Sequence, residues 1–516
     1  MSHEGALEEL DYRRRLAAER GGPGAWERQH SRGKLTVRER LERLVDPGTL
    51  REFGFLRGQG RYEDGRLVSF TPSSLVEGMC RIDGRKVVVT GSDFTVSGGS
   101  GGVPMELGAE LPSNERALEW RLPYVRLLDA AGGSVKSFEE MGRTYPPDGN
   151  VWTTVDVELL DTVPVVSAVM GSVAGLPAIN ACLAHFNVMV RGTAQLFPGG
   201  PPVVKAALGL DVTKEELGGA ELHTSVSGSV DNLADDEDDA LAQIRRFLSY
   251  LPSSVDELPP RVAAAPPMGD PRQLRDLVPE NRRRPFDARR LLELVLDEGS
   301  LFEIGARHGR SRITGLARVD GHPVGVLAND PKHLGGSTDA AAGAKVARLL
   351  QLCDVFHLPV VTFADEPGFM VGPEEEARGI ERAGAQLAWT VTRTRMPWAT
   401  FVIGRLYGVA GQCHHRPSGM FRRYAWPTAR WGSMHISGGA SAAYRREIEA
   451  APDPEAKRRE VEERLEALAS PFRTAEVTGQ DIIDPAETRG LLAEFVDDSQ
   501  RVMATQLGPP RTPYRP

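Results

Sequence analysis

Cysteines, long apolar runs and excess positive charge are all missing or scarce in this chain of 516 residues. The cysteines number only four and lie far apart, and no Cys-x-x-Cys pair occurs among them: Cys80, Cys182, Cys353 and Cys413. This spacing argues against a zinc ribbon, and we predict no metal site. It fits a reduced, cytoplasmic protein best.

No apolar run reaches the roughly 18 residues that a membrane-spanning helix needs, and the N-terminus is charged rather than signal-like. The formal net charge of −9 argues against a general nucleic-acid binder. We therefore expect a cytoplasmic protein with neither a membrane nor a nucleic acid among its partners.

The chain is long enough for two large domains, because one hydrophobic core rarely serves 516 residues. Its composition, 41% hydrophobic and 26% charged, is that of ordinary globular protein. We place a first domain at residues 1–255, a linker rich in proline and charge at 256–285, and a second domain at 286–516. Proline marks the linker because it fixes φ and blocks regular hydrogen-bonded ladders.

The two halves of the sequence repeat one another. CRIDGRKVVVTG from Cys80 parallels ARVDGHPVGVLA from Ala317, and RLPYVRLLDA from Arg121 parallels HLPVVTFADE from His357. The shift is nearly constant: 320 − 83 = 237 for two Asp-Gly turns, 365 − 129 = 236 for the aspartates after each apolar run, and 404 − 171 = 233 for two strand-end glycines. A repeat of this length predicts two domains of one fold rather than a solenoid.

A strand followed by a glycine-spaced turn occurs in each half at matching places. In the second half, the apolar run Phe401–Ile403 leads to Gly404 and Gly408. In the first half, an apolar run ends at Gly171, and Gly175 follows at the same spacing. Such a turn exposes backbone N–H groups with no side chain in the way, which is what an oxyanion site needs. The order strand, turn, helix predicts an α/β fold with ligands at the strand ends.

Other motifs admit both a functional and a structural interpretation. SGGSGG from Ser97 is a phosphate-cradling loop or, as we favour, a flexible turn, because no P-loop lysine follows. The Cys-His-His run at 413–415 either lines a ligand pocket or packs, since a metal site needs three or four ligands. Asp129 and Asp365 are either ligand contacts or caps of the next helix.

Six blocks, in order across almost the whole chain, carry a resemblance to one family: RGKLTVRERLERLVDPGT, SDFTVSGGSGG, GPPVVKAALGLDVTKEELGGAELHT, PGFMVGPEEEARGIERAG, RYAWPTA and DIIDPAETR. They resemble the carboxyltransferase (β) subunit of biotin-dependent acyl-CoA carboxylases of the propionyl-CoA carboxylase type. The resemblance implies an α/β fold of two tandem crotonase-like domains (ClpP/crotonase superfamily), each a spiral of ββα units. It also implies a homo-oligomer, a hexamer or another dimer-based assembly, with each active site between the first domain of one chain and the second domain of its partner.

The same resemblance implies carboxyl transfer from carboxybiotin to the α-carbon of an acyl-CoA through an enolate. The first half is implied to hold acyl-CoA and the second half carboxybiotin, with the biotin nitrogen as the base. Each developing oxyanion needs backbone donors. The family motif places the enolate donors at Gly175 and Leu176 and the biotin-side donors at Val409 and Ala410. Further substrate-binding residues are implied at Gly132, Gly133, Tyr407, Gly408 and Gln412.

A biotin carboxylase and a biotin carboxyl carrier subunit are implied as partners in trans, because no biotin-attachment Met-Lys-Met motif is present. The chain departs from the family at Leu176-Pro177, where the family usually reads Gly-Ala, and Pro177 has no N–H. Gln412 stands where propionyl-type enzymes often have Asp. Three alternatives stay open: a non-catalytic assembly subunit of a heteromeric carboxylase, the carboxyltransferase subunit of an acyl-CoA decarboxylase, and a biotin-independent crotonase-type enzyme.

Overall fold

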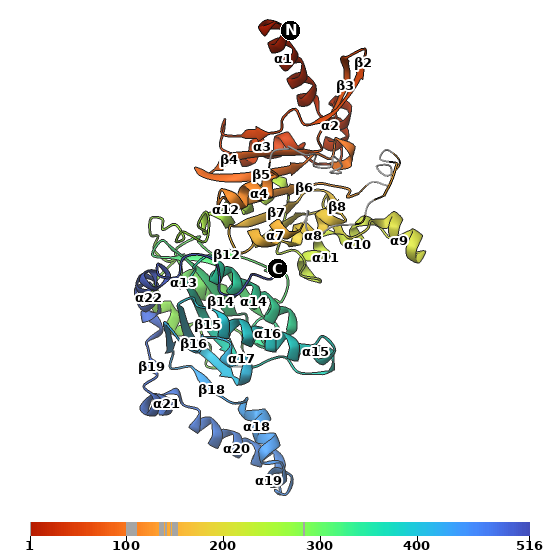
Figure 1. The fold of residues 1–516 in the computed structure, drawn as a ribbon. Coiled ribbons are helices and arrows are strands. Elements are labelled where there is room, and N and C mark those ends of the chain that lie inside the picture. Colours follow the sequence, from red (N-terminus) through yellow and green to blue (C-terminus); the bar gives the residue numbers. More distant parts are fainter. Residues whose placement is uncertain are drawn as a thin grey trace. The chain divides into compact units, whose positions relative to one another are not determined.

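A computed structural model describes residues 2–99, 111–133, 139, 142–144, 146, 153–281 and 284–516. The chain divides into two compact units, residues 1–255 with Pro516 and residues 256–515, each built around its own main sheet (Figure 1). The second half of the SGGSGG motif, residues 100–102, lies outside the described residues. No helix in the described ranges is long and apolar enough to cross a membrane.

The first unit opens with three helices and a hairpin: α1 (His3–Glu19), α2 (Pro23–His30), α3 (Val37–Leu44), β2 (Gly58–Glu63) and β3 (Arg66–Pro72). Helix α3 begins with a capping box. The Glu39 carboxylate accepts from the Thr36 N–H at 2.7 Å, and the Thr36 hydroxyl accepts from the Glu39 N–H at 3.4 Å. This cap fixes the short segment that carries Lys34 and Arg40, two cations that reach the site described below.

A seven-stranded sheet forms the core of the first unit, in the order β1-β4-β5-β6-β7-β9-β11. Its strands are β1 (Arg51–Phe53), β4 (Leu75–Ile82), β5 (Arg85–Ser92), β6 (Tyr124–Leu128), β7 (Val165–Val169), β9 (Phe186–Val190) and β11 (Asn232–Ala234). β1, β4 and β5 pair antiparallel, and every pairing from β5 onward is parallel. Asp83 and Gly84, one of the Asp-Gly turns noted in the sequence, join β4 to β5 as a hairpin with φ of +49° and +78°.

The remaining regular elements in the described part of the first unit are helices, apart from a short parallel pair of β8 (Ser172–Ala174) and β10 (Gln195–Phe197). The helices are α4 (Ser113–Glu119), α7 (Thr154–Leu159), α8 (Leu176–Cys182), α9 (Pro201–Leu208), α10 (Lys214–Gly218), α11 (Ala220–Ser225) and α12 (Glu237–Ser249), with the 3-10 turn η1 (Ser97–Gly99). Strands β6 and β7 are buried along their whole length, as parallel strands covered on both faces are.

The second unit contains an eight-stranded sheet in the order β12-β13-β14-β15-β16-β17-β19, with β18 paired to β16 beside that path. The strands are β12 (Phe302–Glu303), β13 (Arg312–Val319), β14 (His322–Asn329), β15 (Val360–Glu366), β16 (Trp398–Tyr407), β17 (Phe421–Ala425), β18 (Arg430–Gly432) and β19 (Asp481–Ile482). The helices are α13 (Ala288–Val295), α14 (Ala340–Val355), α15 (Pro373–Ala377), α16 (Ile380–Arg393), α17 (Gly408–Gln412), α18 (Ile436–Ala443), α19 (Arg445–Glu449), α20 (Pro454–Leu468), α21 (Pro471–Thr478) and α22 (Thr488–Met503), with η2 (Pro271–Asp276), η3 (Leu334–Gly336) and η4 (Pro485–Glu487).

The two main sheets have the same pairing pattern. In each, two antiparallel pairings come first and four parallel pairings follow. Unusual backbone angles recur at matching positions: φ is +49° at Asp83 and +51° at Asp320, and +54° at Arg121 and +56° at His357. Positive φ is uncommon outside glycine, so its recurrence at shifts of 237 and 236 confirms the predicted duplication.

The proline-rich segment predicted as a linker packs within the second unit. The Val262 N–H donates to the Gly321 carbonyl at 3.1 Å, and the Met268 N–H donates to the Glu293 carbonyl at 2.9 Å. Leu274 is fully buried in the core cluster of the second unit. The described residues of this segment, 256–281 and 284–285, therefore carry few regular ladders, as their prolines predict, and are nevertheless part of the second unit.

Candidate active site

The first glycine turn joins β7 to helix α8. A Cβ on Gly171 would collide with the Asp129 carboxylate, so only glycine lets strand and carboxylate approach so closely. Gly175 follows with φ of +69° and caps α8. A Cβ on Gly132 would come within 2.6 Å of the Ala174 carbonyl oxygen. The structure thus brings together the candidate residues Gly132 and Gly175 at the strand ends of the first unit.

The backbone N–H groups of this turn differ in whether they already have an acceptor within the protein. The Gly175 N–H already donates to the carbonyls of Phe197 and Pro198, at 3.3 and 3.1 Å. Leu176 is the first residue of α8, where an N–H has no acceptor within the helix, and its side chain is 41% exposed. Pro177 has no N–H. Leu176 is therefore the residue of α8's first turn that can offer a donor to a ligand.

The second glycine turn repeats this arrangement at the end of β16. A Cβ on Gly404 would collide with the Asp365 carboxylate, as at Gly171 in the first unit. Gly408 has φ of +62° and begins α17. The shift is constant here, since 404 − 171 = 408 − 175 = 233. It makes Val409 the counterpart of Leu176, and Val409 is 56% exposed.

The two carboxylates behind these turns are held by different cations. Asp129 is fully buried and accepts from Lys34 at 2.8 Å, from Gln29 at 2.9 Å and from Arg40 at 3.2 Å. Asp365 does not cap the next described helix, α15, whose N-cap is Gly372, so the capping alternative does not hold for it. Asp365 instead accepts two side-chain hydrogen bonds and one backbone hydrogen bond from Arg405, at 2.7 to 2.8 Å.

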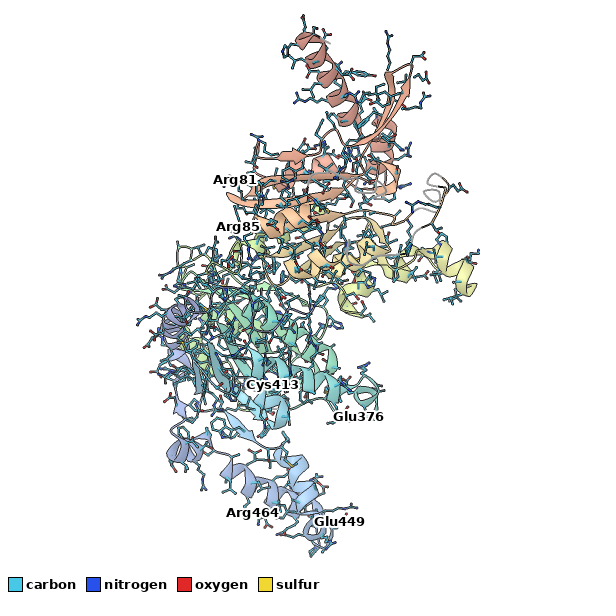
Figure 2. The ribbon with its side chains drawn as sticks, viewed as in Figure 1. Arg81, Arg85, Glu376, Cys413, Glu449 and Arg464 are labelled. Atoms are coloured by element: carbon cyan, nitrogen blue, oxygen red, sulfur yellow. The ribbon has the colours of Figure 1, made fainter. Side chains whose placement is uncertain are left out.

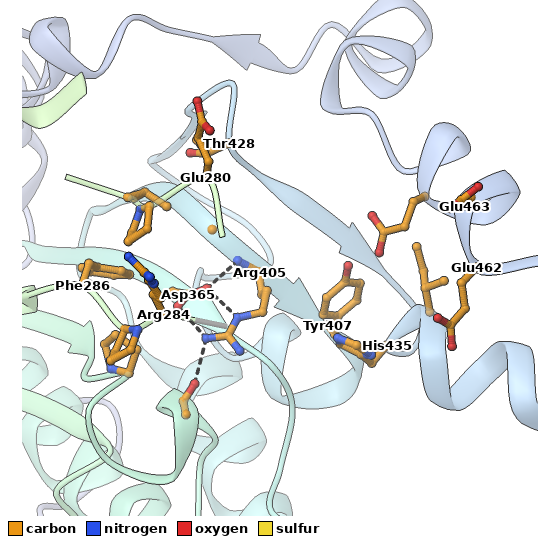
Figure 3. A pocket seen from close by; sticks show the side chains of 18 of the residues that line it. Glu280, Arg284, Phe286, Asp365, Arg405, Tyr407, Thr428, His435, Glu462 and Glu463 are labelled. Carbon is orange, nitrogen blue, oxygen red and sulfur yellow. Dashed lines mark hydrogen bonds and ion pairs between the residues drawn. The ribbon is translucent and has the colours of Figure 1, made fainter. Parts of the chain in front are cut away.

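A cavity of 880 Å³ opens beside Asp365 and Arg405 in the second unit (Figure 3). Tyr407 forms part of its wall, and its ring lies edge-on to His435 with centroids 5.4 Å apart. Further lining residues come from the segment before α13 and from α20: Glu280, Arg284, Phe286, Glu462 and Glu463. Figure 3 shows the dashed bonds between Arg405 and Asp365 beside Arg284.

The residues that hold Asp129 in the first unit have counterparts of other types in the second unit. Asp46 and Asp297 occupy matching turns, each accepting from the two N–H groups of an Asp-Gly pair, and 297 − 46 = 251. The same shift maps the three residues that hold Asp129 to Glu280, Pro285 and Leu291. None of these three donates to Asp365 in the described chain, and two of them line the cavity.

The Cys-His-His run does not face the cavity. Cys413, labelled in Figure 2, is 2% exposed, and His414 is fully buried, with Nε2 at 3.2 Å from both Glu366 and Arg312. Of the two interpretations, packing holds for His414. Gln412 ends α17 and is exposed. Within the described residues no group of His, Cys, Asp and Glu side chains could hold a metal ion.

Burial, together with the charge of Arg312, lowers the pKa of His414 to about 4. His414 is therefore neutral in the folded protein and titrates at its usual value, near 6.5, in the unfolded chain. Between pH 6.5 and 4 the unfolded state binds the extra proton, so the free energy of unfolding falls as the pH falls, by about 1.4 kcal/mol per pH unit. Denaturant unfolding at pH 7 and pH 5 should show a steeper loss for the wild type than for His414→Gln. Equal losses would mean that His414 titrates alike in both states.

Comparisons with known proteins show the family of this chain. The chain matches the carboxyl transferase domain model over residues 28–501. It is 37% identical over 502 residues to the propionyl-CoA carboxylase carboxyltransferase subunit of Haloferax mediterranei, covering 95% of each chain. It is 34% identical over 500 residues to the methylmalonyl-CoA carboxyltransferase 12S subunit of Propionibacterium freudenreichii subsp. shermanii, covering 96% of this chain and 94% of that one.

A solved structure extends the similarity to the fold. The transcarboxylase 12S hexamer, crystallised with methylmalonyl-CoA and methylmalonic acid, matches this chain with a TM-score of 0.86 at 32% identity. The match covers 99% of this chain and 97% of that one. The chain therefore belongs to the carboxyl transferase family, the carboxyltransferases of biotin-dependent acyl-CoA carboxylases, and has their crotonase-like fold.

Proposed function

We propose that this chain transfers a carboxyl group between carboxybiotin, carried on a separate protein, and the α-carbon of an acyl-CoA. The observation that carries the proposal is the pair of duplicated turns, each placing one exposed residue, Leu176 or Val409, at the start of a helix directly after a glycine. Two oxyanions develop in this reaction, and two turns of the same design suit them.

The first unit is the proposed acyl-CoA side. Removal of the α-proton places negative charge on the thioester oxygen, and a donor aimed at that oxygen lowers the barrier. The Leu176 N–H supplies one donor. The loop at Gly132-Gly133, which lies against Ala174, supplies the neighbouring backbone. The Gly175 N–H, predicted as a donor, supports the turn through its bonds to Phe197 and Pro198.

The second unit is the proposed biotin side. Carboxybiotin supplies the carboxyl group when it is bound. The N–H groups of Val409 and Ala410 at the start of α17 suit the ureido oxygen, where negative charge would develop when the carboxyl group leaves, because both are hydrogen-bond donors. Tyr407, the last residue of β16 and the one before Gly408, lines the cavity. The cavity gives room for the biotin ring and the arm that carries it. Gln412, exposed at the end of α17, is the proposed contact nearest the acyl group.

The proposed assembly follows from the relatives. The two relatives named above are carboxyltransferase subunits, and the 12S structure is a hexamer. We propose a cytoplasmic homo-oligomer that receives carboxybiotin from a carrier subunit loaded by a biotin carboxylase. In that assembly the acyl-CoA side of one chain works with the biotin side of another.

The experiment runs the transfer in reverse with purified full-length protein. Malonyl-type CoA thioesters, beginning with methylmalonyl-CoA, donate the carboxyl group, and free biotin accepts it. The expected result is formation of the decarboxylated acyl-CoA that depends on biotin, and the panel identifies the acyl chain. A well-folded protein that turns over no thioester, even with carrier and carboxylase subunits supplied, would favour the assembly-subunit alternative, which Pro177 keeps open.

A further inference from the structure

A buried polar cluster lies beneath the turn that carries Val409. Its members come from five segments of the second unit and are each at most 1% exposed: Arg312, Asn329, Thr338, Glu366 and His414. Placing charges in a protein interior is costly unless each finds partners. The cluster therefore needs an explanation beyond packing.

Glu366 is the centre of the cluster. Its Oε2 accepts from the Thr338 hydroxyl at 2.6 Å and from the Asn329 amide at 3.1 Å. Arg312 Nη1 and His414 Nε2 both lie 3.2 Å from the same oxygen. The second oxygen, Oε1, accepts from the Gly368 N–H at 3.0 Å. One side chain thus contacts both the loop after β15 and the segment after α17.

Backbone hydrogen bonds connect the Glu366 cluster to the loop after β15 and to the segment after α17. The Thr338 N–H donates to the Gly368 carbonyl at 3.1 Å, and the Met370 N–H donates to the Thr338 carbonyl at 2.9 Å. His414 stands two residues beyond the end of α17, and its carbonyl accepts from the Thr400 hydroxyl on β16 at 2.5 Å. Gly368 is the counterpart of Gly132, since 368 − 132 = 236. The cluster therefore fixes the Gly368 loop and the segment after α17 relative to each other.

The first unit shows that the fold itself does not require this cluster. Three of its members map onto apolar residues: Glu366 onto Ala130 (366 − 236), His414 onto Ala181 (414 − 233) and Arg312 onto Leu75 (312 − 237). The same sheet order and the same pair of turns form there without them. These polar side chains are thus features of the second unit alone, and His414 lies two residues after the helix that carries its candidate donors.

We propose that Glu366 and His414 are positioning residues for the biotin side, and this rests on the proposed function above. Glu366 holds the Gly368 loop with one oxygen and His414 with the other, and His414 holds the end of α17. The N–H groups of Val409 and Ala410 then point at a fixed place. Neither side chain touches the ligand; both act through the backbone that they tie down.

The kinetic test compares Glu366→Gln with the wild type in the reverse reaction, using free biotin and a malonyl-type thioester. Loss of hydrogen bonds to a charged group should raise the KM for biotin by about tenfold or more and leave the KM for the thioester within about twofold. A merely structural role predicts fewer active molecules with both KM values unchanged, and that result would overturn the proposal.

Matched variants separate geometry from charge. His414→Gln keeps a donor near the Nε2 position and should behave like the wild type at pH 7, whereas His414→Leu should resemble Glu366→Gln. Glu303→Gln removes a carboxylate of the same unit that pairs with Arg289 at 2.7 Å, and it should leave both KM values unchanged. If His414→Leu behaves like His414→Gln, the imidazole positions nothing.

Amide hydrogen exchange tests the same claim without activity. In Glu366→Gln, peptides spanning 366–370 and 408–414 should exchange about tenfold faster, while the counterpart peptide at 175–182 should be unchanged. Unchanged exchange at 408–414 would overturn the inference even if carboxyl transfer succeeds. Faster exchange at 408–414 in a protein that transfers no carboxyl group would contradict the proposed function. It would still show that the cluster stabilises this turn.

Discussion

Val409→Pro is expected to lower the rate of carboxyl transfer by about 10² to 10³-fold, the usual loss when one oxyanion donor is removed. Proline has no N–H, and its fixed φ is tolerated in the first turn of a helix. Val409 follows Gly408, is 56% exposed and stands at the start of α17. The substitution therefore removes one donor without breaking the helix behind it. The reverse reaction with free biotin measures the effect.

Two comparisons make this result specific. Val409→Ala shortens the same exposed side chain and keeps the N–H, so its rate should stay within about threefold of the wild type. Leu176→Pro makes the corresponding deletion in the first unit, and its loss should appear with every acyl-CoA because the enolate oxygen is common to them. Equal rates for Val409→Pro and Val409→Ala would show that this N–H donates to nothing in the transition state.

The duplication could be predicted from sequence because it rests on local signals. Asp-Gly turns need positive φ, and the strand-end glycines lie where a Cβ would collide with a neighbouring carboxylate. Both kinds of residue therefore recur at a nearly constant sequence shift, although other side chains differ between the halves. The pairs Asp83/Asp320 and Gly171/Gly404 show this, and each pair has the same geometry in both units. Turn chemistry is set by neighbours along the chain, which a single sequence contains.

The details of the candidate site could not be predicted in the same way, because they depend on partners far away in the sequence. The Gly175 N–H is bonded by Phe197 and Pro198, which reach it only through the pairing of β8 with β10. The Glu366 cluster joins residues from 312 to 414 that share no spacing pattern. The core position of Leu274 could not be read from the sequence for the same reason: proline content reports local conformation, not tertiary contact.

Asp129→Asn is expected to cost about 3–5 kcal/mol of stability, the usual penalty for removing one partner of a buried charge pair. The side chain keeps its shape, but two buried cations, Lys34 and Arg40, lose a carboxylate that both contact. Glu237 remains bonded to Arg40 at 2.7 Å and offers no bond to Lys34. Desolvation is already the largest influence on the pKa of Lys34, and it lowers that pKa. Without Asp129 the ammonium is therefore poorly compensated.

The matched variant is Asp365→Asn in the second unit, at the counterpart position. Arg405, its cation, is 23% exposed and beside an open cavity, so water replaces part of the lost interaction. Asp129→Asn should therefore lower the midpoint of urea unfolding of the first unit more than Asp365→Asn lowers that of the second. Tryptophans lie in both units, so each transition needs its own probe, such as hydrogen exchange in β7 and β16. Equal losses would mean that solvent access does not set the cost, and that each carboxylate matters chiefly through the glycine it packs against.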